Sequence, residues 1–275
     1  MRPVHIASIF FISITFYVEI CAEKKLRLIG AQPAQPGQFP WIVSLQRTRT
    51  VRGNETLMHF CAGSIVDSSH VVTAGHCVWN NTNVVITVIA GALNISANED
   101  KQQRVYVRTI HVHPKYKSRN TAGPNDIAIL TLATPLKFNE RVASIALPDP
   151  VKPASGECKY AGWGNRFLIS GIYYNPSPIL GTVSSTVISR FSCTMRYLFV
   201  FRRQLDTALC TSAGPLRGSC QGDSGGPVTC YNSDNTPYLA GVVSWGYFIC
   251  GDGFHPDVAT DVAIFSDFIK KYMND

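Results

Sequence analysis

Three short segments carry residue types that together can perform nucleophilic catalysis. They are His76 in "VVTAGHC", Asp126 in "NDIAIL" and Ser224 in "GDSGGP". A hydroxyl nucleophile needs an adjacent base and a carboxylate that orients the base, and these residues supply all three roles. The surrounding glycines let the backbone approach a substrate carbonyl, so the amides of Gly222 and Ser224 can stabilise an oxyanion. Taken singly, the three are equally consistent with a turn histidine, a strand-capping aspartate and a loop serine.

The elements that would position these residues are mostly strands. Short apolar or alternating runs recur between Gly, Pro and Asn breaks, which indicates an all-β sandwich or barrel. The runs are "WIVSL" (41–45), "VVITVIA" (84–90), "RVYVRTI" (104–110), "IAILTL" (127–132) and "YLAGVVSW" (238–245). The C-terminus differs, because Val262, Phe265, Ile269 and Tyr272 repeat at three- and four-residue steps and predict one amphipathic helix. The stretch 133–143 is the expected boundary between two halves.

The N-terminus has the composition of a secretory signal. A basic residue, Arg2, precedes an apolar run from Ile6 to Val18, and the small Ala22 follows. The run is shorter than the ~20 apolar residues that a spanning helix needs, so we predict cleavage after Ala22 rather than a membrane anchor. Residues 1–22 would thus be a signal peptide, and the mature protein would be secreted, extracellular and without a membrane partner.

Secretion changes how the nine cysteines are interpreted. Cys21 would leave with the signal, and the remaining even set would lie in an oxidising compartment, where disulfides form. No Cys-x-x-Cys or Cys/His ligand spacing indicates a metal site. Composition leaves the pairing of these cysteines open.

The chain carries a formal net charge of +7 over 275 residues. Basic side chains gather in two polar stretches, Arg47, Arg49 and Arg52 in one and Arg196, Arg202 and Arg203 in the other. We favour solvated loops as the interpretation, with an anionic partner such as a sulfated glycan as the alternative. No segment resembles a nucleic-acid-binding motif, and no nucleic-acid partner is expected.

The catalytic segments occur in the order His, Asp, Ser, and "AGWGN" (161–165) and "SWG" (244–246) accompany them. In these segments the chain resembles the chymotrypsin family of serine proteases from about Leu28 to its end. Subtilisins and α/β-hydrolases carry their catalytic residues in other orders. The resemblance implies two packed six-stranded antiparallel β-barrels with a C-terminal helix, and a serine endopeptidase whose triad lies in the cleft between the barrels. Within a protease domain of residues 28–275, the barrel halves would cover roughly 28–137 and 138–260.

The resemblance also implies a disulfide pattern that uses all the mature cysteines. The implied pairs are Cys61–Cys77, Cys158–Cys230, Cys193–Cys210 and Cys220–Cys250. It further implies that Ser244, Trp245 and Gly246 line the substrate backbone as an edge strand.

By the same resemblance, the protein is a zymogen that another, trypsin-like protease activates. Cleavage after Arg27 would remove an activation peptide of residues 23–27 and make Leu28 the new N-terminus. The new amine would fold inward and pair with Asp223. A buried carboxylate is costly without its cation, so the pocket should be poorly formed before cleavage.

The specificity pocket departs from that of trypsin at two positions. Gly218 stands where trypsin carries the aspartate that selects lysine and arginine, and Asp257 stands where trypsin and chymotrypsin carry a glycine. This arrangement is similar to the serine collagenases of crustaceans and insects, the brachyurin-like enzymes, which accept basic, polar and bulky apolar side chains. Ser219, Gln221 and the open mouth at Gly246 are expected to complete the pocket.

Three alternatives to this interpretation of the pocket remain open. Asp257 could be a structural carboxylate held by backbone amides or water. The specificity could be elastase-like. The chain could also be a non-catalytic binding protein on a protease scaffold, although such proteins usually lack one of the three catalytic residues.

No metal or cofactor is expected. The segment 91–101 corresponds to the calcium loop of trypsin, but Ala92 replaces its first carboxylate. His111 and His113 alternate with valines and are expected to point to solvent. Three sequons, at Asn54, Asn80 and Asn94, fit a glycosylated surface. Expected partners are protein or peptide substrates, the activating protease and protein inhibitors, and the enzyme is expected to be a monomer.

Overall fold

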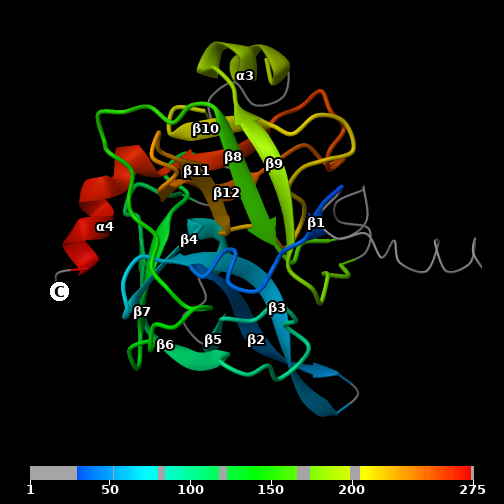
Figure 1. Ribbon diagram of the computed structural model, residues 1–275, viewed down its shortest axis with the longest axis vertical. Coiled ribbons are helices and arrows are strands. Elements are labelled where there is room, and N and C mark those ends of the chain that lie inside the picture. Colours follow the sequence, from blue (N-terminus) through cyan, green and yellow to red (C-terminus); the bar gives the residue numbers. More distant parts are fainter. Residues whose placement is uncertain are drawn as a thin grey trace, which may run out of the picture.

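The computed structural model describes residues 30–51, 53–79, 84–117, 123–165, 174–198 and 205–273. The signal peptide, the activation peptide, Arg27 and Leu28 lie outside these residues, as do Arg52, Asn80, Arg202 and Arg203. Strands dominate the described chain and form two closed antiparallel barrels, one above the other in Figure 1. The predicted all-β class with two six-stranded barrels and a C-terminal helix is confirmed.

The first barrel closes in the order β2-β3-β4-β7-β6-β5. Its strands are β2 (Ile42–Val51), β3 (Asn54–Ile65), β4 (His70–Thr73), β5 (Ile86–Ala90), β6 (Gln103–Val112) and β7 (Ala128–Leu132). Pairing between β2 and β5 closes it. Strands β4, β5 and β7 are buried along their whole length, because other parts of the protein cover their outer faces. The β2–β3 hairpin extends well beyond the barrel wall (Figure 1).

The second barrel contains β8 (Glu157–Gly162), β9 (Gly181–Val187), β10 (Ala208–Ser212), β11 (Pro227–Tyr231), β12 (Pro237–Trp245) and β13 (Asp257–Asp261). The sheet runs β9-β10-β13-β12-β11-β8, and pairing between β8 and β9 closes it. The short N-terminal strand β1 (Gln32–Pro33) adds to β9 of this barrel. The segment that precedes the first barrel is thus anchored on the second.

Hydrogen bonds and a shared core join the two barrels. The indole N–H of Trp41 donates to Thr229 Oγ1 at 3.2 Å, and Ala62 N donates to the carbonyl of Ser224 at 2.8 Å. The main apolar core includes side chains of both barrels, such as Leu45 and Val242. Side chains that the two barrels contribute to the space between them are therefore held at fixed positions relative to one another.

The C-terminal segment forms a 3-10 turn, η1 (Val262–Phe265), followed by helix α4 (Ser266–Met273). It packs against β6, where His111 stacks on Tyr272 at 4.2 Å and His113 meets Phe265 edge-on at 5.0 Å. The expectation that His111 and His113 point to solvent is therefore wrong. Burial against this helix lowers the pKa of His113.

Four disulfides cross-link the described chain: Cys61–Cys77, Cys158–Cys230, Cys193–Cys210 and Cys220–Cys250. These are the pairs that the family resemblance implies. Cys193 lies on the short helix α3 (Arg190–Arg196), which is otherwise largely exposed. Among the described helices, none is long and apolar enough to cross a membrane.

Candidate active site

His76 and Asp126 form the best-defined polar pair in the cleft between the barrels. His76 lies on the one-turn helix α2 (Gly75–Val78) after β4, and Asp126 precedes β7. His76 Nδ1 lies 2.7 Å from Asp126 Oδ2, and the His76 backbone N–H donates to Oδ1 at 2.7 Å. Asp126 is fully buried, and the Ser244 hydroxyl donates to its Oδ2 at 2.5 Å. With Nδ1–H donating to the carboxylate, Nε2 is the unprotonated nitrogen of the ring, and it lies 3.8 Å from Cys77 Sγ.

Ser224 lies in a tight glycine-rich turn that the backbone fixes from three sides. Its carbonyl accepts from Ala62 N, Gly225 N donates to Val243 O at 2.7 Å, and Gly226 N donates to Asp223 O at 2.9 Å. The structure records no direct hydrogen bond between the Ser224 hydroxyl and the described ring of His76. Such contacts are often long without substrate and shorten when it binds.

The amides of Gly222 and Ser224 are the predicted donors of an oxyanion site. Within the described chain, neither amide donates to a protein acceptor, and both residues line the cleft. Gly222 has φ +100°, a conformation that glycine adopts readily and other residues rarely adopt. Both donors are thus available to a negatively charged oxygen.

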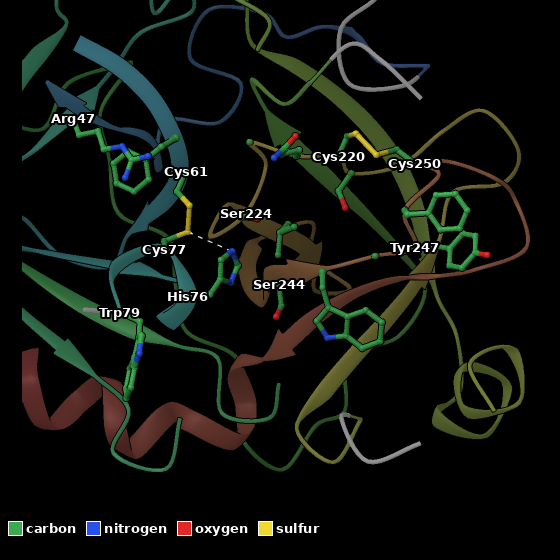
Figure 2. Close-up of a pocket in the computed structure, with 18 residues that line it drawn as sticks. Arg47, Cys61, His76, Cys77, Trp79, Cys220, Ser224, Ser244, Tyr247 and Cys250 are labelled. Atoms are coloured by element: carbon green, nitrogen blue, oxygen red, sulfur yellow. Dashed lines mark hydrogen bonds between the residues drawn. A yellow bond between two sulfur atoms is a disulfide. The ribbon is translucent and has the colours of Figure 1, made fainter. Parts of the chain in front are cut away.

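The cleft that contains these groups has a volume of about 710 Å³ (Figure 2). Ser224 and His76 lie in its middle, Arg47 at one end and Tyr247 at the other. The other predicted substrate-binding residues that line it are Ser219, Gln221, Ser244, Trp245 and Gly246. Gly218 and Asp257 are not among its described lining residues; Asp257 lies against Gly218 and is hydrogen-bonded to Ser219, which does line the cleft.

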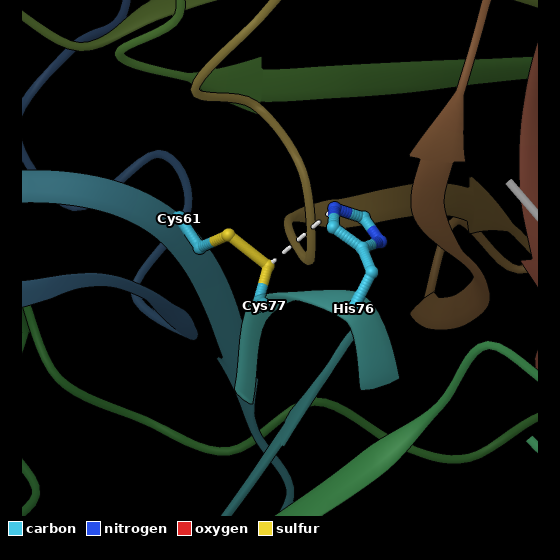
Figure 3. Close-up of side chains that lie close together, drawn as sticks. All are labelled: Cys61, His76 and Cys77. Atoms are coloured by element: carbon cyan, nitrogen blue, oxygen red, sulfur yellow. Dashed lines mark hydrogen bonds between the residues drawn. A yellow bond between two sulfur atoms is a disulfide. The ribbon is translucent and has the colours of Figure 1, made fainter. Parts of the chain in front are cut away.

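A disulfide lies directly beside His76 (Figure 3). Cys77 Sγ is 3.8 Å from His76 Nε2, and Cys61 completes the cluster. Both sulfurs are bonded to each other, so neither is a thiolate that could hold a metal ion. The disulfide instead fixes α2 to β3 and with it the position of His76.

Asp223 is buried and accepts two backbone hydrogen bonds, from Gly164 N at 2.8 Å and from Cys220 N at 2.9 Å. Burial raises its pKa to about 7, although these bonds oppose the shift. A Cβ on Gly162 or Gly164 would lie within 2.1 Å of the carboxylate, which explains both glycines of "AGWGN". Asp223 forms no ion pair with any described residue.

His59, which the sequence motifs do not single out, supports the oxyanion loop. Its Nε2 lies 2.9 Å from the carbonyl oxygen of Gly222, and its Nδ1 lies 2.8 Å from the Ser44 hydroxyl. Burial lowers its pKa to about 4, with the Gly222 bond opposing the shift. The neutral ring therefore donates from Nε2 to Gly222 and accepts from Ser44. Tyr174 donates to the His59 carbonyl at 2.9 Å and covers the same loop.

At the inner end of the pocket, Asp257 contacts Ser219 twice. The Ser219 hydroxyl donates to Oδ1 at 2.7 Å and its amide donates to Oδ2 at 3.2 Å. Burial raises the pKa of Asp257 to about 6, while the two Ser219 bonds lower it. A carboxylate has about four acceptor positions, so two remain for another donor. An ideal Cβ on Gly246 would lie 3.5 Å from Oδ1, so the carboxylate also faces the pocket wall at Gly246.

A brace of aromatic rings supports the outer rim of the cleft. His255 stacks on Tyr247 with ring centroids 3.8 Å apart, and Tyr197 tilts against the same imidazole at 5.3 Å. Asp252 Oδ2 lies 2.5 Å from His255 Nδ1. Tyr247 therefore packs on His255, whose own position is fixed by its hydrogen bond to Asp252.

The loop that corresponds to the calcium site of trypsin is held by protein donors. Both oxygens of Glu99 accept backbone amides, from Leu93 at 2.7 Å and Asn94 at 3.1 Å, and Arg141 lies 3.6 Å from Glu99 Oε2. Of the sequons, Asn94 is half-buried with its side chain accepting from Ser96 N. Asn54 belongs to β3, and its side chain is outside the described atoms.

Comparison with known proteins decides the family. The profile of the family described as Trypsin matches residues 28–269. The chain is 33% identical over 250 residues to "Chymotrypsin-C" of Mus musculus, covering 89% of this chain and 88% of that protein. It is 34% identical over 249 residues to "Trypsin-1" of Astacus astacus, covering 88% and 98%. The chain belongs to the trypsin family.

As a member of the trypsin family, the protein is a serine endopeptidase that acts on protein substrates. The recognition of the family from the sequence is confirmed. The likeness to serine collagenases in specificity, the individual roles of the site residues and the domain boundaries stay predictions.

Proposed function

We propose that this trypsin-family enzyme hydrolyses peptide bonds through an acyl-enzyme formed on Ser224, with His76 as general base and Asp126 as its orienting carboxylate. The observation that carries the proposal is the buried Asp126–His76 pair, which leaves His76 Nε2 unprotonated in the cleft that Ser224 also lines. The two amides without protein acceptors, those of Gly222 and Ser224, support an oxyanion site beside the nucleophile.

In the proposed reaction, Nε2 takes the Ser224 proton as Oγ attacks the scissile carbonyl carbon, and the carbonyl oxygen becomes an anion between the two amides. The imidazolium, stabilised by Asp126, then gives its proton to the leaving amine as the C–N bond breaks. Water attacks the acyl-enzyme by the same route and releases the acid and free Ser224. One such donor amide is worth about 10²–10³ in rate in a comparable enzyme.

We propose a broad specificity for the residue before the cut, with large apolar side chains and also Lys and Arg accepted. Glycine at position 218 leaves space, and the partly free carboxylate of Asp257 supports a cationic side chain. Strict elastase-like preference for small residues is the second candidate, but Gly246 adds no bulk at the pocket mouth.

We propose that the enzyme is made as a secreted zymogen. The disulfides and the signal-like N-terminus support secretion. Asp223 is buried, and its pKa is raised to about 7. A carboxylate in this position would be stabilised by a nearby cation, which supports the proposal that the new amine of Leu28 pairs with it after cleavage at Arg27. Gly30, two residues farther along, packs against the backbone of Leu216. The sequons, the protein inhibitors, the anionic glycans and the monomeric state stay predictions.

The experiment that tests the proposal is covalent labelling of the secreted protein with a fluorophosphonate, before and after brief treatment with trypsin. We expect labelling on Ser224 only after a cut between Arg27 and Leu28, as read by mass spectrometry and terminal sequencing. A protein that is cut there and still takes no label would be a non-catalytic binding protein. Full labelling without the cut would overturn the activation step alone.

A further inference from the structure

Arg47 marks one end of the cleft. It lies opposite Tyr247, with Ser224 and His76 between the two (Figure 2). Its guanidinium lies over the ring of Phe60, 5.2 Å from the centroid. A cation–π contact of this kind orients the guanidinium and leaves its charge in place. Burial and the charge of Asp223 raise the pKa of Tyr174, and Arg47 opposes both, so its charge is felt within the cleft wall.

No acid neutralises Arg47 within the part of the chain that the structure describes. The ion pairs among these residues do not include it, and the described residues that line the cleft include no Asp or Glu. Arg49, two residues along β2, faces the same side of the hairpin because side chains alternate along a strand. Glu55 pairs with Thr50 and so faces the other side. This end of the cleft therefore presents positive charge alone.

The direction of the bound peptide determines which substrate residues meet this charge. In the proposed function, Ser244–Gly246 and the pocket behind Ser219 bind the residue before the cut and those that precede it. The opposite end, where Arg47 and Phe60 lie, then receives the residues that follow the cut.

We propose that Arg47 makes the enzyme prefer substrates with an acidic side chain among the first three residues after the scissile bond. The proposal rests on the proposed function and adds a substrate class to it. A carboxylate there would pair with a guanidinium that is already oriented, so less conformational freedom is lost on pairing. Because the site is open to solvent, we expect a preference of about two- to fivefold, weakened by salt.

The test compares peptides that are identical up to the cut and carry Glu, Gln or Lys at the first, second or third position after it. A 4-nitroanilide with the same acyl part serves as reference, since it has no residues after the cut. For the activated wild-type enzyme, we expect kcat/KM for the best-placed Glu peptide to exceed that of its Gln counterpart by about two- to fivefold and that of the Lys peptide by more. Raising NaCl from about 50 to 500 mM should reduce this preference.

Two substitutions and a control locate the effect. Arg47→Gln should remove the preference for Glu over Gln, and Arg47→Lys should retain part of it. Arg108→Gln, which removes an exposed arginine on β6 of the same barrel, should leave the preference intact. A wild-type enzyme that hydrolyses the nitroanilide but shows no preference for Glu would overturn the inference alone, as would a preference that survives in Arg47→Gln. An activated enzyme that cleaves neither substrate would overturn the proposed function as well.

Discussion

The carboxylate of Asp257 occupies the space into which a side chain at position 218 would project. An ideal Cβ on Gly218 would lie 2.8 Å from Asp257 Oδ2. An acid at position 218 and the acid at position 257 therefore exclude each other in this geometry. The carboxylate that contacts Ser219 therefore comes from β13 and not from position 218.

Replacing Asp257 by Asn tests whether this carboxylate recognises basic side chains. Asn keeps the volume, and with its oxygen accepting from the Ser219 amide its NH2 can donate to the Ser219 hydroxyl oxygen, so the main change is the loss of charge. We expect kcat/KM for Arg and Lys substrates to fall about tenfold or more, with Phe and Leu substrates little changed, since hydrogen bonds to charged groups contribute about 1.5–3 kcal/mol. Equal losses for basic and apolar substrates would instead show that Asp257 is structural.

The preference for basic residues should depend on pH. The pKa of Asp257 is raised to about 6, so below this pH the group is a neutral acid and above it a carboxylate. We expect the ratio of kcat/KM for Arg over Phe substrates to rise as the pH increases from about 5 to 7.5. Taking the ratio cancels the titration of groups that act on both substrates. The ratio should be flat in Asp257→Asn, and a wild-type ratio that is equally flat would contradict the interpretation.

Exchanging the two pocket positions tests their mutual exclusion. Gly218→Asp alone forces a side chain against Asp257, and overpacking of this kind costs roughly 1–3 kcal/mol, so both stability and all cleavage should decrease. Adding Asp257→Gly should restore stability and shift the preference strongly to Arg and Lys. Thermal unfolding and kinetics with Arg and Phe substrates report the two effects. A stable Gly218→Asp single variant would show that the wall has more freedom than this geometry implies.

Asp223 should make the stability of the uncut protein pH-dependent. Its pKa in the folded protein, about 7, exceeds the ordinary value of 3.8, so between these pH values the folded state holds a proton that the unfolded state has lost. Its contribution to the free energy of unfolding therefore falls as pH rises from about 4 to 7. His59, with its pKa lowered to about 4, contributes with the opposite sign over about 4 to 6.5.

The cut form lacks residues 23–27 and gains the amine of Leu28, so comparing it with the uncut form tests whether this amine pairs with Asp223. We expect the Leu28 ammonium to lower its pKa, and the cut form should lose less stability between pH 4.5 and 7.5 in urea unfolding. Ser224→Ala protein avoids self-digestion in both samples. Identical pH profiles for the two forms would argue against an Asp223–amine pair.

The sequence singled out the proposed catalytic groups because each lies in a distinctive local motif. His76, Asp126 and Ser224 follow or precede buried strands, and the structure brings His76 and Asp126 to 2.7 Å. His59 escaped prediction because its role depends on a contact with Gly222, 163 positions away, and nothing in its own strand marks it. Arg47 was assigned to a solvated stretch, since sequence alone does not show that its hairpin borders the cleft.

The wrong expectation for His111 and His113 has a related cause. Alternation along β6 predicts two faces but not what covers them, and here η1 and α4 lie on the face of the histidines. The amphipathic pattern of the C-terminus predicted the helix itself. The surface on which the helix packs is formed only when the first barrel closes, and no local sequence pattern predicts that closure.

The central claim, catalysis by Ser224, is tested most directly by kcat of the activated Ser224→Ala enzyme on a peptide substrate. The backbone amides of the oxyanion site remain in this variant while the nucleophile is gone, so the protein should fold, be secreted and be cut after Arg27 normally. We predict that kcat falls by at least about four orders of magnitude, to a residual rate that is still above the uncatalysed rate. Highly purified variant enzyme that retains kcat within about tenfold of wild type would contradict the account.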